Sequence, residues 1–119
     1  MICIGNDIVN VLRIESIIDK YGKIFLKKIF SKKEITYCSS KKNPNIHFSG
    51  KFSAKEAVIK AIGHFDPSCK IFFKDIEILN DENSRPFVNL KKDSLESLNV
   101  KITISHTDEY ASSFALIQK

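Results

Sequence analysis

Apolar residues recur at helical spacing in the stretch from Gly50 to Gly63, Gly-Lys-Phe-Ser-Ala-Lys-Glu-Ala-Val-Ile-Lys-Ala-Ile-Gly. The apolar stripe consists of Ala54, Ala57, Val58 and Ala61. This period predicts a helix over the stretch, and Gly63 is placed where a glycine commonly ends one. Small alanine side chains allow close packing against a neighbour, with Glu56 and Lys60 at the edge of that contact.

The chain before this helix reads as one strand followed by short helices. Met1 to Ile8 is predicted to be a strand that presents Asp7 at its C-terminal end. The predicted helices cover Asn10–Tyr21, Ile24–Phe30 and, after a capping box of Ser31 and Glu34, the residues through Cys38. Asn-Pro within Lys41 to Asn45 predicts a turn.

The chain after Gly63 has the pattern of strands and turns. The predicted strands are Ile71–Leu79, a return strand from Arg85 to Val88, and a hairpin of Val100–Ser105 with Tyr110–Ile117 around His106–Glu109. Lys92 to Leu98 is predicted to form a short helix. Helices first and strands later indicate an α+β fold, in which the N-terminal strand and the helices pack on a small antiparallel sheet.

Length and composition favour one globular domain over residues 1–119. Hydrophobic residues make up 43% of the chain, which is enough for a core. No apolar run approaches the ~18 residues of a membrane span, and the first residues lack the features of a secretory signal. Cys3, Cys38 and Cys69 have no metal-binding or disulfide spacing, so a reducing cytoplasm fits best.

The net charge of +5 belongs to the first part of the chain. Residues 1–50 hold nine Lys and Arg against four Asp and Glu, whereas residues 51–119 hold ten of each. The cations of the first part are Arg13, Lys20, Lys23, Lys27, Lys28, Lys32, Lys33, Lys41 and Lys42. One-sided basic charge indicates an acidic partner: nucleic acid, anionic lipid or an acidic protein. The alternative is that lysine here serves only solubility.

Asp7 and Glu56 are candidate metal ligands on separate elements. Hard oxygen donors without a suitable His or Cys favour Mg²⁺, which takes one or two carboxylates together with substrate phosphates. Lys60, one turn from Glu56, would then hold a phosphate oxygen, giving a phosphoryl-transfer set. The structural alternatives are an i,i+4 pair of Glu56 with Lys60, a capping box of Ser53 with Glu56, and a helix-capping Asp7.

Other catalytic motifs are missing or weak. The chain has neither of the glycine-rich phosphate loops of standard nucleotide folds. Ser105 and His106 are adjacent in a predicted strand without a nucleophile elbow, which argues against a serine hydrolase. At a strand end, His106 either binds a phosphate or a base or is an ordinary surface histidine.

Several motifs together resemble one family. They are Gly5-Asn-Asp7-Ile-Val9, Gly50-Lys-Phe-Ser-Ala-Lys-Glu56-Ala-Val-Ile-Lys60-Ala-Ile-Gly63, Arg85-Pro86, and Ile104-Ser-His106-Thr with Tyr110-Ala111. In this order they resemble the holo-acyl-carrier-protein synthases, small bacterial phosphopantetheinyl transferases. The resemblance runs nearly end to end and implies a phosphopantetheinyl transferase-like fold.

The resemblance implies a reaction and a set of site residues. Such enzymes move the 4′-phosphopantetheine arm of coenzyme A to a serine of apo acyl carrier protein and release adenosine 3′,5′-bisphosphate. By similarity Asp7 and Glu56 bind Mg²⁺ at the pyrophosphate, where Lys60 neutralises charge. The resemblance further places at coenzyme A the residues Lys51, Arg85, Pro86 and His106, with Lys51 and His106 near its 3′-phosphate. It places at the acidic carrier protein the residues Arg13, Lys20, Lys23 and Lys27.

The family forms trimers with active sites between subunits, so the resemblance implies a homotrimer. Asn10 stands where an acidic residue is frequent, and Lys51 replaces a common Arg, keeping its charge but losing the bidentate fork. The base that accepts the serine proton stays open between Glu56 and a metal-bound water. Two alternatives from other classes are a small basic RNA-binding domain without catalytic activity and a carrier-protein-binding subunit without the metal.

Overall fold

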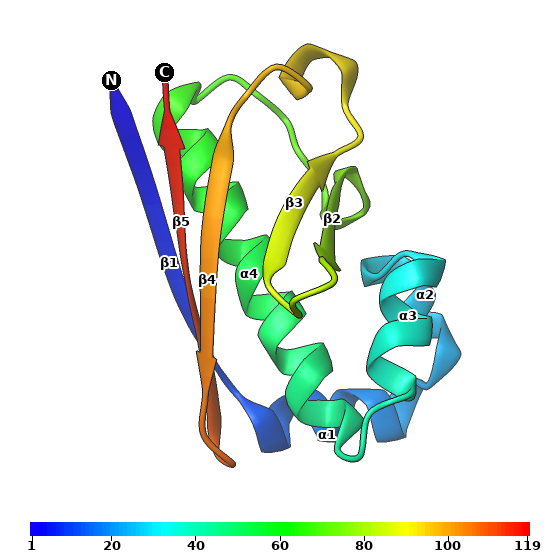
Figure 1. Cartoon of the computed structure of the whole chain (residues 1–119). Helices are drawn as coiled ribbons and strands as arrows, with labels where there is room; N and C mark the ends of the chain where they lie inside the picture. The colour runs from blue at the N-terminus through cyan, green and yellow to red at the C-terminus, as the bar shows by residue number, and fades with distance from the viewer.

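The computed structural model describes residues 1–119 and has an α+β fold, as the sequence predicts (Figure 1). Its helices are α1 (Val11–Tyr21), α2 (Lys23–Ile29), α3 (Lys32–Ser39) and α4 (Pro44–Phe65). Its strands are β1 (Ile2–Asn10), β2 (Ile76–Asn80), β3 (Pro86–Leu90), β4 (Val100–His106) and β5 (Tyr110–Gln118). Two short 3₁₀ turns cover Phe73–Asp75 and Asp93–Leu95.

Helix α4 lies against one face of a three-stranded antiparallel sheet (Figure 1). The strand order is β1-β5-β4, so β1 and β4 are the two edges and β5 pairs with both. Asp7 and Ile104 are both aligned with Ser113 of β5, which places them at the same level on opposite edges. The two chain ends meet at one end of the sheet.

The β2–β3 ribbon packs on α4 beside this sheet and closes the main core. The buried core is built from small α4 residues and branched strand residues: Cys3, Ala54, Ala57, Val58, Ala61, Ile62, Ile76, Ile78, Leu90, Leu95, Ala115 and Ile117. A second core joins α1, α2 and α3 to the first half of α4 through Ile14, Ile29, Phe30, Cys38 and Phe48. Helix α4 therefore belongs to both cores and fixes their relative position.

Strand β1 approaches α4 unusually closely at Gly5. A Cβ atom there would lie 2.7 Å from the Ala61 nitrogen and still closer to the Ala57 carbonyl oxygen. Only glycine fits this backbone-to-backbone contact, which the alanines of α4 complete. Because side chains alternate along a strand, Asp7 faces α4 as Gly5 does, so this close packing brings Asp7 to the helix.

Helix α4 is longer than the Gly50–Gly63 prediction at both ends. Pro44, predicted to lie in a turn, is instead the first helical residue, where a missing N–H costs nothing. Gly63 does not end the helix, because the chain continues helically to Phe65. Ser53 is not a cap either: it is buried mid-helix, where its hydroxyl bonds that of Ser113.

The other predictions mostly hold within a residue or two. The capping box of Ser31 and Glu34 is confirmed, as are the helices at α1 and α2 and the β4–β5 hairpin. Two strand predictions need correction: β1 continues past Ile8 to Asn10, and β2 begins only at Ile76, after a 3₁₀ turn at Phe73–Asp75. Lys92–Leu98 forms a single 3₁₀ turn instead of a helix. No helix has the length and apolar character needed to cross a membrane.

Candidate active site

Asp7 of β1 and Glu56 of α4 line one cavity, about 290 Å³ in volume, which we call the carboxylate cavity. Asn10, Arg13 and Phe52 are also among its lining residues. The packing of β1 beside α4 therefore places both candidate carboxylates in the lining of one cavity. Asn10 has a structural task as well, because its side chain caps α1 by accepting the Arg13 backbone N–H at 3.2 Å.

The two carboxylate oxygens of Asp7 differ in their hydrogen-bond partners. Oδ1 lies 3.2 Å from Nζ of Lys60, which also donates to the Asn6 carbonyl oxygen at 3.0 Å. Oδ2 is buried and has no hydrogen-bond partner. A buried carboxylate oxygen without a partner is costly unless a ligand completes it. The residue that caps α1 is Asn10 and not Asp7, so Oδ2 of Asp7 remains available to a ligand.

The surroundings of Glu56 in the same cavity disfavour its ionised form. Burial first, and the nearby Asp7 carboxylate second, raise the pKa of Glu56, while the Lys60 charge partly offsets them. The salt-bridge alternative for Glu56 is wrong, because Lys60 pairs with Asp7 and not with Glu56. A cation between the two carboxylates would relieve both the repulsion and the unpartnered oxygen.

The donor set of this cavity fits Mg²⁺. It offers carboxylate oxygens, the hard ligands that Mg²⁺ prefers. The structure contains no cluster of three or more His, Cys, Asp or Glu side chains that could enclose a metal ion completely. Two protein ligands would leave coordination positions for water and substrate phosphates, as is usual for Mg²⁺.

A second site, which we call the histidine pocket, lies between α3, α4 and β4. It has a volume of about 350 Å³ and is lined among others by Tyr37, Lys41, His47, Lys51, Pro86 and His106. Lys51, Pro86 and His106 are therefore brought together, as the resemblance implies. Arg85 is not: its side chain is exposed, lies outside this lining and makes no hydrogen bond or ion pair.

Lys51 is held in the wall of the histidine pocket. Its side chain is 4% exposed, and Nζ donates to the Ile78 carbonyl oxygen at 2.5 Å and to Asn80 Oδ1 at 2.7 Å. The same ammonium lies 4.6 Å from the centre of the Tyr37 ring. Burial is the main cause that lowers the pKa of Lys51.

The two sites lie on opposite sides of α4. His47 and Glu56 are nine residues apart, as are Lys51 and Lys60, and nine residues make two and a half helical turns. The strands agree with this split, because Asp7 is on edge strand β1 and His106 is on the opposite edge strand β4. A single chain therefore presents its carboxylates and its histidine pocket in different directions.

The predicted partner residues share a basic surface on α1 and α2. Lys20, Lys23 and Lys27 are exposed, and Arg13 is exposed beside the carboxylate cavity. Apolar side chains accompany them, since Ile24 is 77% exposed. Exposed cations of one sign on neighbouring helices fit an acidic partner, as the charge pattern of the sequence indicates.

Sequence reasoning missed the fully buried ion pair of Glu34 with Lys55. Lys55 Nζ lies 2.8 Å from Glu34 Oε1 and donates to three backbone carbonyl oxygens, those of Ile29, Phe73 and Ile76. The other oxygen of Glu34 accepts the Ile78 N–H at 2.8 Å. Lys55 precedes Glu56 in the motif, but it holds α4, α3 and β2 together rather than facing a ligand.

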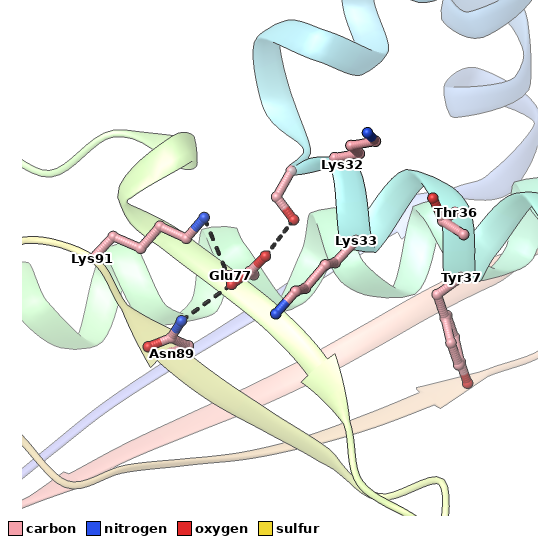
Figure 2. A pocket seen from close by; sticks show the side chains of 8 residues that line it. Lys32, Lys33, Thr36, Tyr37, Glu77, Asn89 and Lys91 are labelled. Atoms are coloured by element: carbon pink, nitrogen blue, oxygen red, sulfur yellow. Dashed lines mark hydrogen bonds and ion pairs between the residues drawn. The ribbon is translucent and has the colours of Figure 1, made fainter.

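A third cavity, about 760 Å³ in volume, is larger than the carboxylate cavity and the histidine pocket (Figure 2). Figure 2 shows Glu77 at its centre, with Lys91 and Asn89 on one side and the start of α3 on the other. Glu77 accepts from Ser31 Oγ at 2.6 Å and from Asn89 Nδ2 at 3.1 Å, and Lys91 Nζ lies 3.6 Å away. Unlike Asp7, this carboxylate has all the partners it needs.

Comparisons with known proteins show the family to which this chain belongs. Residues 3–115 match the family model of the 4′-phosphopantetheinyl transferase superfamily. The holo-[acyl-carrier-protein] synthase of Protochlamydia amoebophila is 44% identical over 116 residues, covering 95% of this chain and 94% of the relative. That of Chlorobium luteolum is 39% identical over 113 residues, covering 93% and 94%.

Solved structures of the same kind of enzyme superpose over nearly the whole chain. The Helicobacter pylori holo-[acyl-carrier-protein] synthase in complex with coenzyme A is 28% identical, with a TM-score of 0.83 and coverage of 97% of this chain and 99% of that one. The Neisseria meningitidis enzyme is 26% identical, with a TM-score of 0.87 and full coverage of both. This chain therefore belongs to the holo-[acyl-carrier-protein] synthase family of phosphopantetheinyl transferases.

Proposed function

We propose that this chain, as a single domain over residues 1–119, transfers 4′-phosphopantetheine from coenzyme A to a serine of apo acyl carrier protein. The serine Oγ forms a bond to the phosphorus that carries the pantetheine arm. The bond from that phosphorus to the bridging oxygen breaks, and adenosine 3′,5′-bisphosphate leaves with the electron pair. The serine proton passes to a base in the carboxylate cavity, where Glu56 is the candidate of this chain.

The observation that carries the proposal is the unpartnered buried Oδ2 of Asp7 in a cavity shared with Glu56. We propose that Asp7 and Glu56 hold Mg²⁺ there. When bound, Mg²⁺ would withdraw charge from pyrophosphate oxygens as a Lewis acid. Lys60, half-exposed and tied only to Asp7 and a backbone oxygen, is free to turn its ammonium toward a phosphate.

A second copy of the chain is needed to complete the site. In coenzyme A the 5′-pyrophosphate and the 3′-phosphate are attached to the same ribose, whereas the carboxylate cavity and the histidine pocket lie on opposite sides of α4. A helix with its side chains is about 10–12 Å across. The carboxylate cavity of one copy facing the histidine pocket of the next would bring both to one nucleotide.

The outer face of the three-stranded sheet supports such an assembly. Its side chains away from α4 include Ile2, Ile4, Ile8 and Phe114, all between 40% and 64% exposed. Contiguous exposed apolar side chains on a sheet face mark an interface. Repetition of one head-to-tail contact closes into a ring, and we propose the homotrimer that the family resemblance implies.

The basic surface would receive the carrier protein. Arg13 links that surface to the carboxylate cavity, so a protein docked on α1 and α2 can deliver its serine there. Since the three cysteines are free thiols, a reducing cytoplasm is the compartment that we propose.

The test is the mass of apo acyl carrier protein after incubation with the chain, coenzyme A and Mg²⁺. We expect an increase of one phosphopantetheine and the appearance of adenosine 3′,5′-bisphosphate. Binding of carrier protein without a mass change would instead indicate the metal-free subunit. RNA binding with neither effect would favour the RNA-binding alternative.

A further inference from the structure

Asn10, the last residue of β1 and the N-cap of α1, contributes a neutral side chain to the lining of the carboxylate cavity. Its side-chain oxygen accepts the backbone N–H of Arg13 at 3.2 Å, which is the one side-chain hydrogen bond that Asn10 makes. This cap decides which end of the amide is which, because an NH₂ group cannot accept a hydrogen bond. The other end of the side chain, beside the cavity, is therefore an uncharged donor.

The charged groups around the carboxylate cavity balance one another. Asp7 and Glu56 supply two negative charges, and Arg13 is the one cation in the lining. Lys60 adds a second positive charge, because its Nζ lies 3.2 Å from Oδ1 of Asp7. With Asn10 neutral, two negative and two positive charges leave a formal sum of zero. A free divalent cation therefore meets oxygen ligands there but little net attraction.

The cavity also offers few ligands to a divalent cation. The affinity of an oxygen site for such a cation depends on the number of its charged ligands, and Mg²⁺ commonly completes a small protein set with water and substrate phosphates. Asp7 and Glu56 are the only acidic residues in the lining. Oδ1 of Asp7 is moreover engaged by Lys60, which leaves Oδ2 as its open oxygen. The phosphate oxygens of an arriving nucleotide would supply both the missing negative charge and the missing ligands.

We propose that Asn10 is a specificity-determining residue whose neutral side chain keeps the carboxylate cavity from holding a divalent cation without the pyrophosphate of coenzyme A. The inference rests on the proposed transfer from coenzyme A. The cation and the nucleotide then bind jointly, and each strengthens the binding of the other by the same factor. A third carboxylate at position 10 would instead hold the cation before the nucleotide arrives.

Asn10→Asp is the variant that tests this role, because it changes charge at nearly constant shape. One oxygen of the new carboxylate can keep the cap of α1, since Asp and Asn are about equally good N-caps. The other oxygen takes the place of the NH₂ group and adds one negative charge to the cavity. Asn10→Ser is the matched control, because serine also caps a helix but carries no charge.

The measurement counts free Mn²⁺ by electron paramagnetic resonance, with and without coenzyme A, corrected for the Mn²⁺ that coenzyme A binds by itself. Mn²⁺ replaces Mg²⁺ as the probe because both prefer oxygen ligands. We expect coenzyme A to tighten Mn²⁺ binding by about tenfold or more in the wild type and in Asn10→Ser. Asn10→Asp should bind Mn²⁺ alone about tenfold more tightly than the wild type, because a charge is added beside a divalent cation. Asp7→Asn in the Asn10→Asp chain should remove this gain, which would locate the ion in the cavity.

Three results would overturn the inference. They are a wild type that binds Mn²⁺ equally well with and without coenzyme A, an Asn10→Asp chain with the wild-type affinity for Mn²⁺ alone, and a gain in Asn10→Ser as large as that in Asn10→Asp. These binding measurements need no turnover, so they are separate from the test of the proposed function. A wild type that leaves apo carrier protein unmodified would refute the transfer itself, whereas one that modifies it but fails the Mn²⁺ test would refute only the role of Asn10.

Discussion

The two sides of α4 differ in charge, in completeness and in what each needs. On one side Asp7 and Glu56 bring two carboxylates together with a single half-exposed lysine, and one buried oxygen has no partner. On the other side the histidine pocket gathers cations around an open space. The charge of the first side favours a cation, and that of the second favours an anion.

This difference is the basis of our proposal that two copies of the 119-residue chain share one site. The magnesium complex of a nucleotide offers both signs of charge within one ribose and its phosphates. One chain presents the matching groups in opposite directions, whereas two copies in the proposed head-to-tail contact would present them face to face.

Removal of a carboxylate from the cavity should have the largest effect. Asp7→Asn and Glu56→Gln keep the side-chain volume but each removes one of the two proposed metal ligands. Loss of a ligand at a charged transition state costs several kcal/mol, so turnover should fall by about a thousandfold, at tenfold per ~1.4 kcal/mol. The measurement is carrier-protein modification over a Mg²⁺ titration.

The control for these variants is their thermal stability, which should not fall, because the repulsion between the two carboxylates is removed. Near-normal turnover of Glu56→Gln at every Mg²⁺ concentration would mean that Glu56 is no metal ligand.

Lys55 provides a contrast to Lys51, one turn earlier on the same helix. Lys55→Met leaves Glu34 buried without its partner, which typically costs about 3–5 kcal/mol of folding stability. Chemical denaturation should show this loss, with Glu34→Gln/Lys55→Met recovering part of it. A Lys55→Met chain with wild-type stability and impaired coenzyme A binding would reverse the assignment and make Lys55 a ligand residue.

The sequence predicts the carboxylate side better than the histidine side, for physical reasons. Asp7 and Glu56 lie in a spaced motif, and Gly5 and the alanines indicate the close packing that joins them. Lys55 cannot be recognised in this way, because its partner Glu34 is 21 residues away and already has a local explanation in the capping box.

His47 and the limits of α4 were beyond sequence reasoning for similar reasons. The neighbours of His47 come from α3 and β4, and no spacing along the chain encodes such a meeting. Asn-Pro is equally compatible with a turn and with a helix start, so Pro44 misled the prediction. Gly63 stayed helical because α4 packs on the sheet beyond it, which outweighs the ~1 kcal/mol preference against glycine.

Glu77 is a buried carboxylate that, unlike Asp7, has a hydrogen-bond partner for each oxygen. Burial acts to raise the pKa of Glu77, but hydrogen bonds from Ser31 and Asn89 and the charge of Lys91 lower it below its ordinary 4.5. A lowered folded-state pKa stabilises the fold above pH 4.5, and this stability is lost as the pH falls through the lower value.

Glu77→Gln should therefore cost about 1–3 kcal/mol near neutral pH and flatten the acid limb of a melting-temperature profile from pH 7 to 3. Transfer activity at neutral pH should be unchanged. Lost activity in a stably folded Glu77→Gln chain would extend the active site to the largest cavity.

Single charges on the basic surface should have the smallest effect. Lys23→Glu should raise KM for the carrier protein by about two- to fivefold, since exposed charge pairs contribute roughly 0–1 kcal/mol. KM for coenzyme A should stay the same, and added salt should shrink the difference. Lys70→Glu, on an exposed loop outside that surface, is the control. An equal rise of KM for the carrier protein in this variant would mean that net charge, and not the basic surface, causes the effect.

Subunit mixing tests the shared site most directly. Asp7→Asn disables only the carboxylate cavity, and His106→Glu disables only the histidine pocket by repelling phosphate. Each variant alone should be inactive at coenzyme A concentrations below KM. After joint unfolding and refolding at equal amounts, about a quarter of the contacts should pair two intact sides, because half of the copies retain each side. Recovery of activity toward that level is the predicted result, and a mixture as inactive as its two parents would contradict a site built between copies.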